Sequence, residues 1–415
     1  MAENKFSNSG HIYASIGAAV GVANLVLFPA RVFSYGGLAF IVVFIISTLL
    51  LGYPLMVGEI ALGKHGQSNA VDSYTKIGGK KWSWAGKFGL ITTSVILSFY
   101  IIIAGWSLYY LFQFAFNFSD IENLLFESLQ SKTPARTAIA KMFVDFSTNS
   151  SKVILYSGAF MALTIFIVAQ KISAGIEKIG KIFVPLLIVL LIILFVFINV
   201  LEGKDLNFSN FNFDASKLFS MTSTGGIGFI EAVGQAFFSL SLGACSMITF
   251  GNHLKKKTNV TRNAHYIVHT DTLVALLAAL LIIPLFIPTS QIGINPGLVF
   301  ISLVDTFISF GFVWGKVVGI LFFFLFNIAI LTSAVSLLEP TVNYYSKNQE
   351  RGRQPYAIVI GIVVFIVAIP SILSFNPNAP ALFRNFLGYG SGGAMGFFNF
   401  VIDFFGTFCI LLGGL

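Results

Sequence analysis

Two apolar segments of this chain are interrupted at their centres by glycine and small polar residues, and they occupy matching places in its two halves. The first covers residues 17–29 and the second residues 235–245. A helix that unwinds inside a bilayer exposes N–H and C=O groups that lipid cannot satisfy, so these groups must line a cavity or bind something. Two such breaks, one in each half, predict a substrate and ion site at the bilayer midplane.

The composition supports a protein that crosses the membrane several times. Hydrophobic residues make up 56% of the sequence, charged residues only 10%, and phenylalanine occurs 46 times. A soluble domain cannot bury this much apolar surface. We expect no cleavable signal, because the first ten residues are polar and no cleavage site follows the first apolar stretch. The two cysteines, Cys245 and Cys409, lie in apolar segments and form no disulfide framework.

Hydropathy predicts about ten membrane spans, whose loops differ in charge. The spans lie near residues 11–33, 37–61, 88–114, 152–170, 177–201, 228–253, 264–288, 314–343, 356–375 and 396–415. Basic residues follow the even-numbered spans: Lys64, Lys76, Lys80, Lys81, Lys87, Lys171, Lys178, Lys181, Lys255, Lys256, Lys257, Arg262, Lys347, Arg351 and Arg353. Acidic residues gather in the alternate loops: Asp120, Glu122, Glu127, Asp145, Glu202, Asp205 and Asp214. The positive-inside rule therefore predicts a multi-pass protein of the cell inner (plasma) membrane with a cytoplasmic N-terminus. The net charge of +8 is thus explained by topology and not by a nucleic-acid partner.

The spacing of the breaks predicts one transporter domain over residues 1–415, built from two repeats of five spans. Repeat one covers about 11–201 and repeat two about 228–415. An odd number of spans per repeat inverts the second repeat relative to the first. The expected fold class is therefore an all-α membrane protein, a 5+5 inverted-repeat bundle with unwound first and sixth transmembrane helices. The chain ends at Leu415, inside or at the end of the tenth span, which suits either a short protein or a truncated one.

Several short stretches of the chain together indicate a known family. They are residues 19–24 with Phe28-Pro29, 52–56 with Glu59, 175–178, 234–243, 295–300, and 331–333 before Glu339-Pro340. With them the chain resembles the neurotransmitter:sodium symporter family, in particular its bacterial amino-acid transporters with a leucine-transporter-like fold, from about Gly10 to Leu415. Each stretch alone is weakly specific, but together they follow the order and spacing of the family. The resemblance implies sodium-coupled transport by alternating access.

The resemblance also implies two sodium sites, and sodium as a hard cation favours oxygen ligands. Site one would use the Ala19 carbonyl, Asn24, Ser239 and Asp271, with Thr270 as the alternative if the register slips by one. Site two would use the Gly17 and Val20 carbonyls with Ala329, Thr332 and Ser333. Alternatively, Thr332 and Ser333 form ordinary hydrogen bonds to the preceding helical turn.

Two acidic residues within spans require separate interpretation, because a carboxylate in a membrane is costly. Asp271 either serves site one or lies at a helix end near the cytoplasmic surface. Chloride-dependent relatives carry a serine four residues later, where this chain has Ala275, so Asp271 could supply the charge that chloride supplies elsewhere. By resemblance, Glu59 accepts hydrogen bonds from unwound amides of span six; the alternative is a proton carrier.

The substrate site implied by the resemblance surrounds both breaks. A substrate carboxylate would meet amides near Val22 and Ala23 and the Tyr100 hydroxyl, and the half-helix N-terminus favours such an anion. The amino group would meet carbonyls at Ala19, Phe238 and Ser239 and the Ser241 hydroxyl. Relatives that carry monoamines have Asp at the position of Gly21, so glycine indicates a substrate with its own carboxylate. The apolar pocket would consist of Ala18, Ile96, Ala244, Ala334 and Leu337 with Phe238 as a lid. The small Ala244 favours a bulky apolar or aromatic side chain.

The chain departs from the family at both gates. The outer-gate arginine of the family is Leu27 here, Arg31 lies one helical step from the expected face, and Asp403 therefore lacks its usual partner. The cytoplasmic Arg and Trp before span one are replaced by Ala2 and Lys5, and Lys347 stands where an acid is expected after span eight. These substitutions leave the gating ion pairs unexplained by sequence.

The sequence therefore predicts a sodium-coupled symporter that imports a zwitterionic amino acid, and not an enzyme. Na⁺ at two sites is the expected ion, without an organic cofactor, and the partners are the amino-acid substrate and the lipid bilayer. The alternatives are a proton-coupled or exchanging amino-acid carrier on the same fold, with Asp271 or Glu59 titrating, and a non-transporting amino-acid sensor. His265 and His269 lie four residues apart, but no third zinc ligand is evident.

Overall fold

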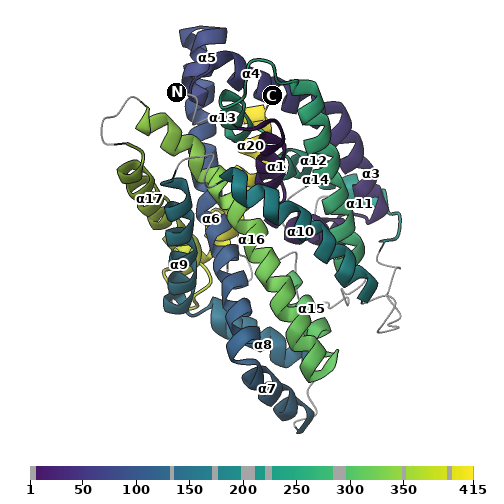
Figure 1. Cartoon of the computed structure of the whole chain (residues 1–415). Helices are drawn as coiled ribbons and strands as arrows, with labels where there is room; N and C mark the ends of the chain where they lie inside the picture. The colour runs from purple at the N-terminus through teal and green to yellow at the C-terminus, as the bar shows by residue number, and fades with distance from the viewer. Residues whose placement is uncertain are drawn as a thin grey trace.

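The computed structural model of the chain describes residues 6–130, 135–170, 176–197, 211–219, 227–283, 296–347, 352–389 and 395–414. The regular elements in these residues are helices and helical turns (Figure 1). The first half contains α1 (Asn8–Ala19), α2 (Phe28–Ser34), α3 (Leu38–Ser47), α4 (Tyr53–Gly66), α5 (Ala70–Gly78), α6 (Ser83–Phe116), α7 (Phe118–Gln130), α8 (Ala135–Ser147), α9 (Ser150–Val168) and α10 (Ile176–Val196). The second half contains α11 (Ser216–Phe219), α12 (Gly228–Ser239), α13 (Ser246–Asn252), α14 (Val260–Ile282), α15 (Pro296–Ile308), α16 (Gly311–Ser346), α17 (Gln354–Leu373), α18 (Ala381–Arg384), α19 (Gly396–Asp403) and α20 (Ile410–Gly414).

Tighter or wider helical turns join some of these helices. Three π-helical turns, η2 (Ala23–Leu27), η3 (Thr48–Gly52) and η8 (Phe404–Cys409), lead into α2, α4 and α20, and a 3₁₀ turn, η4 (Lys80–Trp82), precedes α6. Such turns inside long helices shift the direction of the side chains that follow, and they are frequent at functional sites. Here η2 contains Ala23, which lines the pocket described below, and η8 contains Thr407, which contacts Arg31.

The expected membrane spans agree with the helices that the structure forms. In the described residues, eight helical spans are long and apolar enough to cross a membrane. A ninth would consist of α1 followed by η2 and α2, two helical parts that are bent by 45° at the break between them. The sixth predicted span corresponds to α12 and α13, which are separated by six residues. The ends of two predicted spans, at 198–201 and 284–288, lie outside the described residues, as do Gly175 and Asn295.

Two long helices form the centre of the bundle. Figure 1 shows α6 and α16 running side by side through the molecule, and most of the apolar length of each is buried inside it. The Trp106 ring of α6 is fully buried and contacts Phe143, Phe300 and Phe375 edge to face. Such aromatic contacts add to the stabilisation that comes from burial. They hold α8, α15 and the end of α17 against α6.

The outer helices turn apolar side chains away from the bundle. Leu50 in η3 is 69% exposed and Ile366 in α17 is 57% exposed. Large apolar surfaces of this kind are untenable in water, but they suit contact with lipid chains. The exposed Trp82 and Trp84 stand beside Lys80 and Lys81, as expected for an anchor at the membrane interface.

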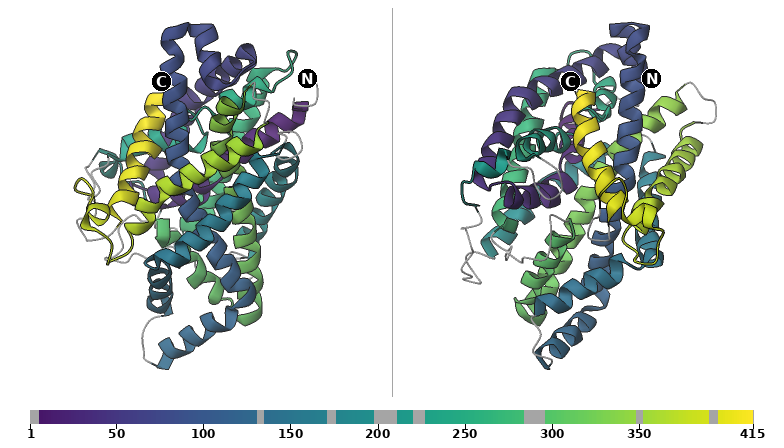
Figure 2. Two further views of the ribbon diagram at one scale, coloured as in Figure 1. Left: turned by 90° about the vertical axis from the view of Figure 1, so that its left-hand side faces the viewer. Right: turned by 180° about the vertical axis from the view of Figure 1, so that it is seen from behind.

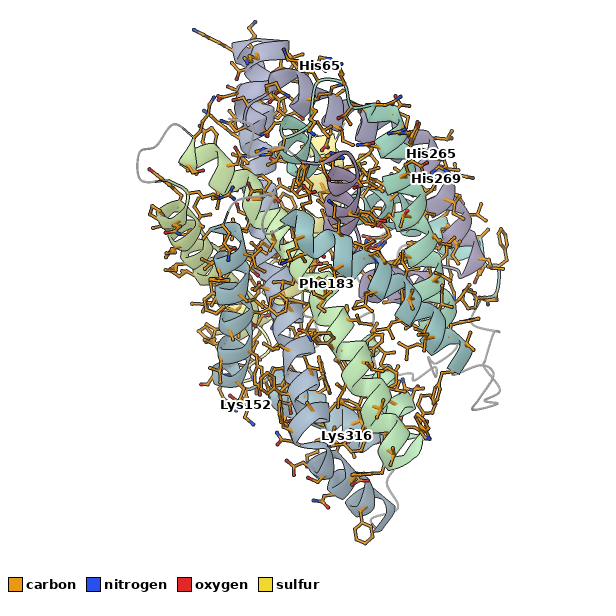
Figure 3. The ribbon with its side chains drawn as sticks, in the orientation of Figure 1. His65, Lys152, Phe183, His265, His269 and Lys316 are labelled. Carbon is orange, nitrogen blue, oxygen red and sulfur yellow. The ribbon has the colours of Figure 1, made fainter. Side chains whose placement is uncertain are left out.

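Both chain ends lie at the same end of the molecule as α5, and α7 and α8 lie at the other end (Figures 1 and 2). Figure 3 places His65, His265 and His269 toward the first of these ends and Lys316 toward the second. We call the first the N-terminal end and the second the distal end. The lysines of α4, α5 and η4 lie toward the N-terminal end, whereas Asp120 and Asp145 belong to α7 and α8.

Candidate functional site

The first helix breaks where the sequence predicts. Residue Val20, directly after α1, adopts an extended backbone with φ −77° and ψ 113°, and helical structure resumes only near Ala23. A side chain at Gly21 would force its neighbours or the break to shift, because a Cβ atom there would lie 2.2 Å from the Tyr100 hydroxyl and 2.5 Å from the Ser333 hydroxyl. The chain therefore brings backbone groups of the break against α6 and α16.

The second break separates α12 from α13. Ser241, Gly243 and Cys245 have positive φ angles of 53°, 73° and 58°, which no regular helix can contain. The Glu59 carboxylate accepts a 2.7 Å hydrogen bond from the Gly243 amide, as the resemblance implied. A glycine is needed at 243 for a second reason, because a Cβ there would lie 2.2 Å from the Ile410 carbonyl oxygen.

The first predicted sodium site brings three side chains together from three helical segments. Asn24, Ser239 and Asp271 are fully buried. The Asn24 amide donates to the Ser239 hydroxyl at 2.9 Å and to the Asp271 carboxylate at 2.9 Å. Ser239 in turn donates to the other carboxylate oxygen at 2.5 Å. The interpretation of Asp271 as a helix-end residue near the surface is therefore wrong, because its side chain lies at the centre of the bundle.

The second predicted sodium site joins the end of α1 to α16. The Ser333 hydroxyl donates to the Val20 carbonyl at 3.0 Å and to the Gly17 carbonyl at 3.2 Å. Thr332 donates to the Ala329 carbonyl of its own helix at 2.9 Å. Ser333 thus contacts the partner helix, whereas Thr332 follows the alternative interpretation of back-bonding to the preceding turn.

The chemistry of both clusters suits a hard cation. In the part of the chain that the structure describes, no group of three His, Cys, Asp or Glu side chains could hold a metal ion. A cation at the first cluster would combine one carboxylate with amide, hydroxyl and carbonyl oxygens, whereas a cation at the second would meet hydroxyl and carbonyl oxygens alone. Oxygen ligands of this kind favour alkali and alkaline-earth ions over transition metals. The residues present therefore fit sodium.

A pocket opens between the two breaks. It is lined by Ala18, Ala19, Ala23, Tyr100, Phe238, Ser241, Ala244, Ser333, Leu337 and Ile410. Other predicted substrate residues do not line it: Ser239 belongs to the Asn24 cluster, and Ile96 and Ala334 are fully buried. The Val22 amide donates to the Tyr100 hydroxyl at 3.1 Å, and the Ser241 hydroxyl donates to the Ala18 carbonyl at 3.1 Å.

Sequence reasoning did not assign two of the lining residues to the pocket. Ser333 was expected only as a sodium ligand, but it lies against the pocket as well. Ile410 belongs to the last span, which the sequence links to no break. Nothing in a single apolar isoleucine indicates contact with a pocket whose other lining residues come from distant parts of the chain, so only the packing of α20 shows it.

The structure gives Arg31, which the sequence left without a partner, an acid to pair with. Arg31 forms a 3.0 Å ion pair with Glu231, and both side chains are buried. Sequence reasoning considered only Asp403 as the partner, whereas the acid that Arg31 meets lies on α12. At the N-terminal end, Lys347 forms an ion pair with Asp72 of α5, so an acid is supplied from another helix.

Comparison with known proteins agrees with the fold. The sequence model of the "Sodium:neurotransmitter symporter family" matches residues 3–120 and 140–405. The chain belongs to this family. Like other sodium:neurotransmitter symporters, it is a membrane transporter and not an enzyme.

Relatives of known sequence or structure cover most of the chain. The uncharacterised sodium-dependent transporter YhdH of Bacillus subtilis is 33% identical over 375 residues, which are 89% of this chain and 78% of YhdH. An uncharacterised sodium-dependent transporter of Haemophilus influenzae is 30% identical, over 88% of this chain and 79% of its own length. The crystal structure of MhsT in complex with L-phenylalanine matches with a TM-score of 0.84 and 34% identity, covering 99% of this chain and 88% of MhsT.

Proposed function

We propose that this symporter imports a zwitterionic amino acid with a bulky apolar or aromatic side chain, driven by sodium and working by alternating access. The observation that carries the proposal is the contact of Asn24, Ser239 and Asp271 beside a pocket between two broken helices. The pocket offers backbone groups and hydroxyls to the carboxylate and amino group of an amino-acid substrate. It offers apolar residues to the side chain of that substrate. The L-phenylalanine complex of MhsT supports an aromatic amino acid as the substrate.

Sodium would occupy both clusters in this proposal. At site one, Asn24, Ser239 and Asp271 would turn their oxygens to the ion together with the Ala19 carbonyl. At site two, the Gly17, Val20 and Ala329 carbonyls would join the Thr332 and Ser333 hydroxyls. Each ion that moves down a tenfold gradient supplies about 1.4 kcal/mol, and a potential of 100 mV adds about 2.3 kcal/mol. Two ions would therefore support accumulation of roughly 10⁵-fold.

A cytoplasmic N-terminus in the plasma membrane and a 5+5 inverted repeat complete the proposal. The lysines near α4, α5 and η4 at the N-terminal end favour a cytoplasmic location for that end. The bend between α1 and α2 and the interruption between α12 and α13 support the repeat, in which they would be equivalent breaks. Alternating access would then open the pocket toward the N-terminal end and toward the distal end in turn.

Uptake of radiolabelled L-phenylalanine into proteoliposomes tests the proposed function. A sodium gradient should drive uptake, and replacing external sodium with choline should abolish it. Uptake that follows a proton gradient in choline would instead support the proton-coupled alternative. Sodium-dependent binding without any uptake would support the alternative that the protein is a non-transporting amino-acid sensor.

A further inference from the structure

The Arg31 side chain joins three separate helical segments. Its guanidinium donates to the Gln235 side-chain oxygen at 2.6 Å and to the Thr407 hydroxyl at 3.1 Å. It also forms the 3.0 Å ion pair with Glu231. Arg31 belongs to α2, Glu231 and Gln235 to α12, and Thr407 to η8. Arg31 is only 5% exposed, so these contacts form in a region of low polarity, where charge-assisted hydrogen bonds are strong.

The position of this network follows from the helical spacing of α12. Phe238 lines the pocket, Gln235 lies about one turn before it, and Glu231 lies about one further turn away. The Phe238 ring stacks on Phe99 with their centroids 6.3 Å apart. Going back along α12 from the pocket, the chain therefore places an aromatic contact first and the Arg31 contacts next.

The network also contacts the break in the first helix. The Gln235 side-chain nitrogen donates to the Ala23 carbonyl at 2.8 Å, while its oxygen accepts from Arg31. Ala23 lines the pocket and begins η2. One amide side chain thus connects the guanidinium to the backbone that borders the pocket. A change in the Ala23 backbone would alter the Gln235 contacts and, through them, the position of Arg31.

We propose that Arg31, Glu231 and Gln235 form the outer gate of this transporter, and that Gln235 couples closure of the gate to occupation of the pocket. The proposal rests on the proposed function. Opening toward the distal end requires α2 to separate from α12 and η8, so the Arg31 contacts must break. Substrate and sodium would order the backbone from Gly21 to Ala23. That order favours the Gln235 hydrogen bond and therefore the closed gate.

Release of bound substrate tests the gate separately from the site. We would compare wild type with Arg31→Gln, Glu231→Gln and the charge-exchanged Arg31→Glu/Glu231→Arg pair. Loss of one charge-assisted contact changes an equilibrium by about tenfold or more. L-[³H]phenylalanine that was bound in the presence of sodium should therefore be released at least about tenfold faster from the two single variants than from wild type. The exchanged pair should release more slowly than Arg31→Glu alone. Arg262→Gln, at an exposed arginine of α14, is the matched control.

Cysteine accessibility gives a second measurement that needs no substrate. In a Cys245→Ser/Cys409→Ser background, Ser241→Cys places a reporter in the pocket. A membrane-impermeant thiol reagent added at the distal face should label this reporter about tenfold faster when Arg31→Gln is also present. Labelling and release rates equal to those of wild type in both single variants would overturn the gate. If wild type binds no amino acid in sodium, the proposed function fails, but the labelling comparison still decides whether Arg31 closes the distal side.

Discussion

The Ser239 hydroxyl on α12 donates a 2.5 Å hydrogen bond to the Asp271 carboxylate on α14. The contact fixes a carboxylate beside both helix breaks, and Asn24 contacts the same carboxylate from η2. A buried carboxylate without a cation is costly. Sodium at this place would offset that cost, and the carboxylate would make an additional anion unnecessary.

Transport should therefore be independent of chloride. Asp271 supplies a fixed charge, and Ala275 offers no hydroxyl to an anion. Uptake in sodium gluconate should equal uptake in sodium chloride. In contrast, Asp271→Asn should raise the sodium concentration for half-maximal uptake by about tenfold or more, since about 1.4 kcal/mol of lost attraction corresponds to tenfold. A large loss of wild-type uptake in gluconate would contradict the charge argument.

The second sodium site should depend on two hydroxyls of α16. Ser333 already contacts the Gly17 and Val20 carbonyls, whereas Thr332 must turn from the Ala329 carbonyl to reach an ion. Thr332→Ala combined with Ser333→Ala should strongly raise the sodium concentration that half-maximal uptake requires. Ser336→Ala removes a buried hydroxyl of the same helix that donates to the Ser333 carbonyl, and it serves as the control. An unchanged sodium requirement in the double variant would eliminate this site.

A side chain at Gly21 should abolish binding. In Gly21→Ala the new methyl group would approach the Tyr100 and Ser333 hydroxyls to 2.2 and 2.5 Å, so these side chains or the α1 break would have to move. Sodium-dependent binding of labelled L-phenylalanine should be lost. Gly58→Ala is the matched control, because a Cβ atom there meets nothing within 4 Å. Normal binding by Gly21→Ala would show that the break is less constrained than its contacts indicate.

The ion pair of Asp72 with Lys347 should contribute little to stability. Both side chains are 39% exposed, and exposed pairs typically contribute about 0–1 kcal/mol. Partial burial alone would raise the pKa of Asp72, but hydrogen bonds from Lys347, Ser68 and Asn69 and the Lys347 charge lower it below 3.8.

The contribution of this ion pair to folding stability is therefore present above about pH 4, and it is lost as the pH falls through the lowered pKa of Asp72. Thermal unfolding of Asp72→Asn should differ from wild type by a small, constant amount between pH 5 and pH 8. A difference that grows steadily across that range would contradict the assignment.

Local sequence patterns were sufficient for the spans and for the helix breaks. Gly17, Gly21 and Gly243 stand out because small residues interrupt apolar runs, and the structure shows the reason at Gly21 and Gly243 in the close approach of other segments. The expected contact of Glu59 with span six is likewise confirmed, because its carboxylate accepts the Gly243 amide.

The contacts between distant segments could not be read from the sequence. Arg31 was assigned no partner because only the position of Asp403 was considered, whereas Glu231 lies 200 residues away from Arg31 on α12. Ile410 reaches the pocket only because α20 packs on the Gly243 backbone. Such contacts depend on the rotation of one helix against another, which hydropathy does not determine.

Two substitutions in the pocket should report on the polar and apolar ends of the substrate. Tyr100→Phe removes a hydroxyl that accepts from the Val22 amide and could donate to a carboxylate. A hydrogen bond to a charged group contributes roughly 1.5–3 kcal/mol, so amino-acid affinity should fall by about ten- to a hundredfold. Competition by amines that lack a carboxylate tests this assignment: if they compete as well as amino acids with wild type, Tyr100 does not bind a carboxylate.

The size of the preferred side chain should depend on Ala244 and Ile410, which line the same pocket. Ala244→Phe fills space there and should shift preference toward alanine and glycine, whereas Ile410→Ala removes apolar volume and should favour tryptophan over leucine. Competition binding across the amino acids measures both shifts in one assay. Ile366→Ala, at a 57% exposed position of α17, is the control for loss of an isoleucine outside the pocket. An unchanged size ranking in Ala244→Phe would show that residue 244 does not contact the substrate, and the alignment of α12 and α13 with the family would then have to be redrawn.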